Sequence, residues 1–328
     1  MSTAAAEAEF PLADLHRAFS RIREQLDLVI LGQPLMKERT LACLLAGGHG
    51  LIEGPPGTGK TLLALALSRL LGCRFRRIQF TPDLMPVDLL GTNVFNQRTQ
   101  EFAFHPGPVF TDVLLADEVN RTTPRTQSAL LEAMQERAVT IDGVRNTVSP
   151  VFFVLATQNP VEYEGTYPLP EAQKDRFLLK IEVDYPTQDD EVSMLRAYSE
   201  GHSLHEDALG RLSPVIDARE LALAVKTVAT RVRVEDRLLA YIREVVATTR
   251  SVEGVQLGAG PRASLALLAT SRSLAALRGR DFVTPDDVKE LAPAVLAHRV
   301  ILSPEAEMEG LDLTAIVQRI FERIEVPR

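Results

Sequence analysis

The residues best suited to chemistry stand in one short run of the chain. The run reads Gly-Pro-Pro-Gly-Thr-Gly-Lys-Thr, with the members Gly54, Pro55, Pro56, Gly57, Thr58, Gly59, Lys60 and Thr61. It matches in full the pattern of a phosphate-binding loop, in which glycines let backbone N–H groups point into one concavity. A helix that begins here would add the positive end of its dipole. In such a loop the lysine reaches the β- and γ-phosphates and the threonine hydroxyl ligates Mg²⁺, so Lys60 and Thr61 are the candidates for these tasks.

Two adjacent acids, Asp117 and Glu118, end an apolar run that begins at Val113. A phosphate-binding loop needs one carboxylate to hold Mg²⁺, and Asp117 fits this task. Hydrolysis also needs a base for the attacking water, and Glu118 is the candidate. The sequence lacks the Asn-Lys-x-Asp motif that reads guanine. The paired acids therefore favour an ATPase over a small GTPase.

Three further polar residues each leave two interpretations open. Asn159 follows the next apolar run and could orient the attacking water, or it could form a turn with the proline after it. Arg176 could stabilise the charge of phosphoryl transfer from a neighbouring chain, or it could pair with Asp175. Arg262 stands at a helix start, where the dipole disfavours a cation. This hints at an anionic partner, and a solvated side chain is the alternative.

Short strands that alternate with helices must position these residues. Apolar runs predict strands at residues 50–53, 75–80, 113–116, 151–156 and 177–183. Helical spacing of apolar residues and flanking Gly and Pro predict helices at 12–28, 36–46 and 61–71. Such alternation is typical of an α/β fold with a parallel sheet in three layers.

Two expected hairpins, near residues 89–108 and 138–150, interrupt this alternation without being needed for the sheet. After residue 186 the pattern changes to amphipathic helices, expected near 188–200, 217–228, 235–250, 262–278, 286–298 and 313–324. The sequence therefore predicts a flexible tail at 1–11, an α/β core at 12–186 and a small all-helical domain at 187–328.

Composition excludes several classes of protein. The 328 residues carry 36 Lys and Arg against 44 Asp and Glu, a net charge of −8, which counts against a protein that coats DNA non-specifically. No apolar run approaches the roughly 18 residues that a membrane span needs. The N-terminus lacks the basic and apolar parts of a signal peptide, so a cytoplasmic location is expected. The two cysteines are too few for a disulfide scaffold.

Taken together, these segments resemble the MoxR family of AAA+ ATPases over nearly the whole chain. Besides the phosphate-binding loop, the stretches that carry the resemblance are 29–33, 80–86, 104–108, 115–121, 130–136, 156–170, 171–177 and 285–288. The resemblance implies an AAA+ core with a helical lid domain. It also implies a ring, usually a hexamer, that binds ATP and Mg²⁺ between its subunits.

The resemblance also gives the candidate residues more specific roles. Asp117 and Glu118 correspond to the Walker B pair, and Asn159 corresponds to sensor 1. Arg176 corresponds to an arginine finger that acts on the neighbouring subunit. Arg262 corresponds to sensor 2, acting on its own subunit from the lid.

The adenine end of the site and the two insertions complete the comparison. Ile30 and Gly32 lie where such proteins receive adenine. The hairpins match insertions that tend to face the pore of the ring. One departure is visible, because Gly260 stands where a serine is more usual before Pro261 and Arg262.

The work implied is chaperone-like remodelling, maturation or metal insertion on a protein client, with a separate von Willebrand factor A domain protein as a frequent partner. A DNA translocase of the related MCM clade is one alternative, although the net charge counts against nucleic acid as a partner. An ATP-dependent assembly switch or scaffold is another. A small-molecule kinase fits poorly, because the sequence shows no acceptor pocket.

Two other groups of residues receive simpler interpretations. The three phenylalanines between residues 95 and 104 could grip a substrate, but packing of the hairpin on its own domain is favoured. The three arginines between 74 and 77 are interpreted as a solvated strand edge.

Overall fold

The computed structural model describes residues 10–159, 165–199 and 206–327. Most of the expected tail and residues 160–164 of the stretch 156–170 therefore lie outside the described residues. The core is a five-stranded sheet in the order β2-β5-β8-β1-β9, with every pair parallel. Its strands are β1 (Gly50–Glu53), β2 (Phe75–Gln79), β5 (Val113–Asp117), β8 (Phe153–Gln158) and β9 (Leu179–Glu182). The expected parallel sheet is confirmed.

The sheet is covered on both faces, which explains its continuously apolar strands. Because successive side chains of a strand point to opposite faces, a strand buried on both sides must be apolar throughout. In β5, Leu115 belongs to one core cluster, while Leu114 and Ala116 belong to another. The first cluster is shared by the helices α1 (Leu12–Val29), α2 (Pro34–Leu45) and α3 (Lys60–Leu70). The second is shared by α4 (Pro86–Leu90) and α5 (Pro124–Glu136).

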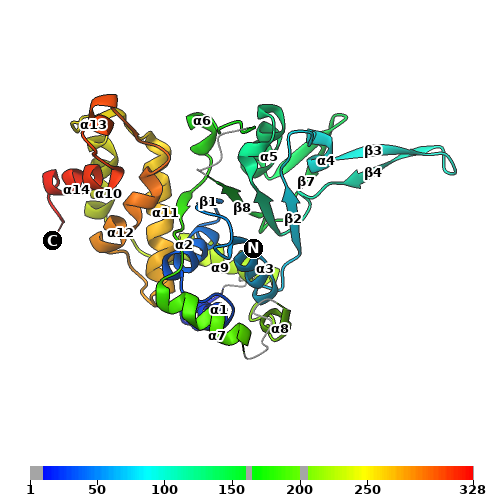
Figure 1. Ribbon diagram of the computed structural model, residues 1–328, viewed down its shortest axis with the longest axis horizontal. Helices are drawn as coiled ribbons and strands as arrows, with labels where there is room; N and C mark the ends of the chain where they lie inside the picture. Colours follow the sequence, from blue (N-terminus) through cyan, green and yellow to red (C-terminus); the bar gives the residue numbers. More distant parts are fainter. Residues whose placement is uncertain (1–9, 160–164, 200–205, 328) are drawn as a thin grey trace, which may run out of the picture.

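Both insertions form antiparallel hairpins. One joins β3 (Gly91–Asn96) to β4 (Glu101–Pro106) and projects from the body of the molecule (Figure 1). The other joins β6 (Ala138–Ile141) to β7 (Val144–Thr147). The Asn93 side chain donates a hydrogen bond of 2.6 Å to Asp142, which links the two hairpins.

The phenylalanines of the projecting hairpin differ in their surroundings. Phe104 lies 5.3 Å from Phe110, measured between ring centroids, and packs at the base of the hairpin. Phe95 and Phe102 contact each other at 5.2 Å, yet they are 45% and 72% exposed. The expected packing on the domain therefore holds for Phe104 and is wrong for the other two.

The C-terminal part is helical, as expected for a lid. Its helices are α7 (Gln188–Ser199), α8 (Glu206–Gly210), α9 (Ala218–Arg231), α10 (Asp236–Thr248), α11 (Pro261–Leu277), α12 (Pro285–Leu296), α13 (Pro304–Met308) and α14 (Leu313–Arg323). One short ribbon, β10 (Val255–Leu257) with β11 (Ile301–Leu302), was not predicted from the sequence. In the ranges that the structure describes, no helix has the length and apolar character needed to cross a membrane.

The helical part packs against the core along one side of the sheet. The α11 helix contacts α1 and α2, and α12 contacts the edge strand β9. The α8 helix also contacts α1, and the α9 helix contacts both α1 and α2, so these two helices lie against the N-terminal helices. In Figure 1, α10 to α14 lie at the opposite end of the molecule from the β3–β4 hairpin.

Candidate nucleotide site

A cavity of about 540 Å³ opens at the carboxyl ends of β1, β5 and β8, which are neighbours in the sheet. Ligands of open α/β sheets bind at this edge. Residues predicted from the sequence that line the cavity are Ile30, Pro56, Gly57, Thr58, Gly59, Lys60, Thr61, Asp117, Glu118 and Asn159. Gly54 and Pro55 belong to the same loop but are not among the lining residues. The structure thus brings together most of the predicted site.

The loop between β1 and α3 has the conformation that its glycines permit. Gly57 and Gly59 have φ angles of 81° and 84°, in the left-handed region that favours glycine. Gly59 caps the N-terminus of α3, which begins at Lys60. The Lys60 ammonium donates a hydrogen bond of 2.6 Å to the carbonyl of Gly54. Burial lowers the pKa of Lys60, and the carboxylate of Asp117 opposes this shift.

Asp117, the last residue of β5, and Glu118 after it are held by side chains of the neighbouring strands. The Thr157 hydroxyl donates to Asp117 Oδ1 at 2.6 Å and accepts the Glu118 backbone N–H at 2.9 Å. Glu118 has a left-handed φ of 59°, an uncommon conformation for this residue type. Its carboxylate accepts a hydrogen bond from Gln79 and pairs with Arg121 at 3.1 Å. Thr157 was not predicted from the sequence, although it stands in the polar end of β8, two residues before Asn159.

Arg77 is a second residue of this site that was not predicted from the sequence. It lines the cavity, and its Nη2 and Nε lie 2.6 Å and 3.1 Å from Asp117 Oδ2. Arg77 is exposed on the edge strand β2, as interpreted from the sequence, but it also pairs with an acid of the nucleotide cavity. The Arg77–Asp117 pair forms because β2 lies beside β5 and places Gln79 opposite Asp117. Arg74 likewise pairs with Asp112 although its side chain is exposed, and Arg76 is exposed as well.

Part of the cavity lining is apolar. It includes Ile30, Met194 of α7 and Leu209 of α8. Gly32 is not a lining residue. With a φ of 66° and its backbone against the Asp190 side chain, Gly32 shapes the turn before α2.

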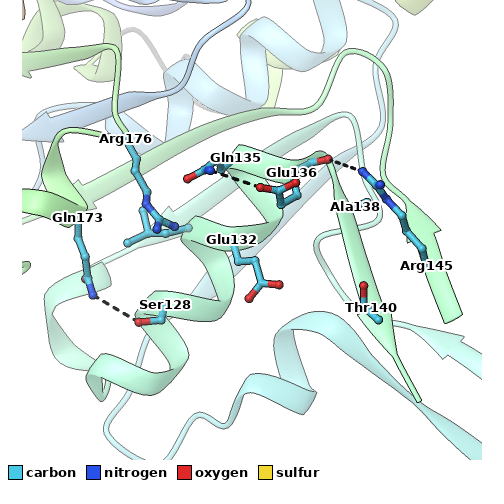
Figure 2. A pocket seen from close by; sticks show the side chains of 10 residues that line it. Ser128, Glu132, Gln135, Glu136, Ala138, Thr140, Arg145, Gln173 and Arg176 are labelled. Atoms are coloured by element: carbon cyan, nitrogen blue, oxygen red, sulfur yellow. Dashed lines mark hydrogen bonds between the residues drawn. The ribbon is translucent and has the colours of Figure 1, made fainter. Parts of the chain in front are cut away.

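Arg176 lies in a different cavity, also of about 540 Å³, between α5 and the β6–β7 hairpin (Figure 2). It follows the short helix α6 (Glu171–Lys174) and shares this cavity with Glu132 and Arg145. Among the described residues, no hydrogen bond or ion pair engages its guanidinium. Asp175 pairs instead with Arg299, at 2.7 Å, so the alternative of an Asp175–Arg176 pair is not what the structure shows.

The structure does not bring Arg262 to the nucleotide cavity. Its Nη1 lies 3.5 Å from Asp175 Oδ2, next to the Arg176 segment. The expected contact with the nucleotide of its own subunit is therefore not made in this arrangement. The reason lies in the lid: α11 and α12 pack along α2 and β9, and this carries the N-terminus of α11 to the β9 edge of the sheet.

Comparison with known proteins agrees with this geometry. Residues 49–179 match the family model of ATPases associated with various cellular activities (AAA), and residues 247–320 match that of the AAA lid domain. The chaperone MoxR1 of Mycobacterium tuberculosis is 41% identical over 330 residues, 98% of this chain and 85% of the relative. The chain belongs to the MoxR family of AAA+ ATPases. The protein YeaC of Bacillus subtilis is 46% identical over 314 residues, 96% of each chain. A crystal structure of a candidate ATPase from Cytophaga hutchinsonii has a TM-score of 0.87 at 38% identity and 96% coverage of each chain.

Membership in the MoxR family confirms two predictions made from the sequence. The fold is that of an AAA+ protein, with a parallel-sheet core followed by a helical lid. The chain is an ATPase of a family that includes a chaperone.

Proposed function

We propose that this MoxR-type ATPase works as a ring that uses ATP and Mg²⁺ to remodel a protein client. The observation that carries the proposal is the position of Arg176. Its guanidinium lies outside the nucleotide cavity of its own chain, in a separate cavity where no described residue engages it. Phosphoryl transfer gains greatly from an arginine at the γ-phosphate. A second copy of the chain would supply this arginine if its Arg176 reached the nucleotide cavity of the first copy.

Within one chain, the residues of the cavity divide the chemistry. Backbone N–H groups of the loop and Lys60 bind the phosphates, and the apolar lining that includes Ile30 receives adenine. Thr61 and Asp117 provide the hard oxygen ligands that suit Mg²⁺, which would neutralise phosphate charge. Glu118 accepts the proton of the attacking water, and Asn159 orients that water.

Arg262 belongs to the same proposal in a changed role. Because it lies beside the Arg176 segment, both arginines would face the neighbouring subunit's nucleotide. This replaces the action on its own subunit that the resemblance implies. Two cations at one edge of the subunit suit the anionic phosphates of a neighbour.

The proposal extends to the partners and location of the ring. We expect a hexamer in the cytoplasm, a separate partner with a von Willebrand factor A domain, and a client whose maturation or metal insertion needs force. The exposed pair Phe95 and Phe102 on the projecting hairpin offers the client an aromatic contact. The net charge of −8 argues against DNA as the substrate.

The test is an ATPase assay on mixed rings of two variants, Glu118→Gln and Arg176→Ala. Each alone is expected to lose at least about 100-fold in turnover, as is typical for loss of a general base or an arginine finger. In mixed rings a Glu118→Gln subunit still lends Arg176 to a neighbour whose Glu118 is intact, so activity returns. Two variants that co-assemble and stay inactive would refute the shared site and favour an ATP-dependent assembly switch. DNA-stimulated, salt-sensitive turnover would instead favour the translocase.

A further inference from the structure

Arg299 is a buried arginine of the lid that reaches into the core. It lies three residues after the end of α12, and its side chain is 3% exposed. Its Nε donates to Asp175 Oδ1 at 2.7 Å, and its Nη2 donates to the Phe177 carbonyl at 2.6 Å. Its Nη1 donates to the Leu178 carbonyl at 3.2 Å. A lid residue thus holds the chain immediately before and after Arg176.

The remaining donors of Arg299 are also used. Nη2 makes a second bond to the Asp175 carbonyl at 3.3 Å, and Nη1 makes one to the Val295 carbonyl of α12 at 2.6 Å. A guanidinium has five N–H donors in a rigid fork, so this pattern is complete. The adjacent His298 adds a contact of 2.9 Å between its Nε2 and the Phe177 carbonyl. No other residue type could make the same set of bonds, because a lysine offers three donors on a flexible stem.

The hydrogen bonds of Arg299 do more than pack the lid against the core. A buried charge is costly, and apolar residues of similar volume often stabilise a fold equally well. Four of the five bonds of Arg299 end on the Asp175–Leu178 segment, and they fix its backbone on both sides of Arg176. The Arg176 guanidinium itself has no partner among the described residues. The backbone that Arg299 holds therefore fixes the point and the direction in which the Arg176 side chain leaves the chain.

We propose that Arg299 is a positioning residue that orients Arg176 toward the neighbouring subunit. Through Arg299, this orientation depends on the position of the lid. The inference rests on the proposed action of Arg176 on its neighbour. Arg262 of α11 also contacts Asp175, so two lid segments converge on this one carboxylate. A displacement of the lid would therefore move the segment that carries Arg176.

The proposal is tested with Arg299→Gln and Arg299→Lys in the full-length protein. A misplacement of about 1 Å at a reacting centre can cost on the order of 100-fold in rate, so each variant alone should lose about 10- to 100-fold in turnover. Binding of a fluorescent ATP analogue to the variant's own cavity should stay within about twofold, because Arg299 does not line it. A merely structural role would lower binding and turnover together.

Mixed rings give the decisive comparison. An Arg299→Gln subunit keeps its own Glu118, so mixing with Glu118→Gln subunits should restore activity, whereas mixing with Arg176→Ala subunits should not. If Glu118→Gln rescues Arg176→Ala but not Arg299→Gln, the positioning role is overturned and the shared site stands. If neither pair is rescued, the shared site fails and the positioning role fails with it.

Two more variants guard against a simple folding defect. Asp175→Asn keeps the shape of the side chain, leaves the bonds of Arg299 to the Phe177 and Leu178 carbonyls, and should show the same pattern of rescue at a smaller loss. Arg137→Gln is the matched control, because Arg137 also binds two backbone carbonyls, of Gly47 at 2.8 Å and Pro150 at 2.6 Å, and neither belongs to the Asp175–Leu178 segment. It should lower the melting temperature and leave turnover per folded chain unchanged. A turnover loss in Arg137→Gln equal to that in Arg299→Gln would overturn the proposal.

Discussion

Nη2 of Arg77 lies 2.6 Å from Oδ2 of Asp117, so an arginine of the edge strand β2 pairs with the acid proposed to hold Mg²⁺. The pair lies at the wall of the nucleotide cavity and joins two neighbouring strands. A guanidinium and a divalent cation would compete for the same carboxylate. Arg77 therefore offsets part of the negative charge of Asp117.

Arg77→Gln should lower the Mg²⁺ concentration needed for half-maximal binding of an ATP analogue by about three- to fivefold. The Arg77 side chain is about half exposed, and a pair of this kind contributes at most about 1 kcal/mol. The measurement is a Mg²⁺ titration of fluorescent analogue binding. Arg76→Gln is the matched control, because Arg76 lies on the same strand but does not line the cavity. A Mg²⁺ requirement that rises in Arg77→Gln would show that Arg77 assists the ion instead of competing with it.

Thr157→Val should reduce turnover about tenfold and destabilise the fold by about 1–3 kcal/mol. Thr157 is 1% exposed, and valine would leave the Glu118 N–H unpaired in a buried place. It would also remove the donor that orients Asp117. Urea unfolding and steady-state ATPase measurements check both effects. Thr157→Ser keeps the hydroxyl and should retain most of the activity; equal losses in the two variants would disprove the role of the hydroxyl.

Lys60→Ala should abolish the rise in melting temperature that ATP causes. A ligand present at 100 times its Kd stabilises the folded state by about 2.7 kcal/mol, and loss of the phosphate contacts of Lys60 removes most of this gain. Thermal unfolding with and without ATP is the measurement. Glu118→Gln serves as the control, since it removes the proposed base but keeps the loop, and it should retain the full shift. A normal shift in Lys60→Ala would place the nucleotide elsewhere.

The buried His49 should make the fold sensitive to acid. Its Nδ1 accepts the Val154 N–H at 3.1 Å, and its Nε2 lies 3.2 Å from the Met134 carbonyl. Burial lowers the pKa of His49 to about 4, below the value of about 6.5 in an unfolded chain. The unfolded state therefore binds a proton first as the pH falls. The contribution of His49 is complete above pH 6.5 and is lost progressively toward pH 4, by about 3 kcal/mol in total.

Urea unfolding of the wild type and of His49→Gln at pH 7 and pH 5 tests this. The variant should be less stable at pH 7 and should lose less stability on acidification. Part of the acid sensitivity should remain, because burial also lowers the pKa of His298. An identical loss in both proteins would exclude His49 as a source of the pH dependence.

The phosphate-binding loop, the two acids and the alternation of strands and helices could be predicted from the sequence, because local pattern determines them. Glycines at 57 and 59 permit left-handed backbone whatever lies around them, and a strand buried on both faces must be apolar throughout. The residues that determine where a helix begins also lie close together in the sequence. At the start of α12, for example, the Asp287 carboxylate accepts the backbone N–H of Thr284 at 2.8 Å, a contact within one turn of the chain.

What only the tertiary structure decided depends on contacts between distant segments. Arg77 and Thr157 reach the acids because β2 and β8 flank β5, and no spacing along the chain reveals which strands become neighbours. The β10–β11 ribbon has strands of three and two residues, too short for a periodic signal. The packing of the lid on β9 places Arg262 and Arg299 at Asp175, across 87 and 124 residues. Local pattern fixes the backbone and its reactive groups, whereas packing of the lid on the sheet edge determines which way the arginines point.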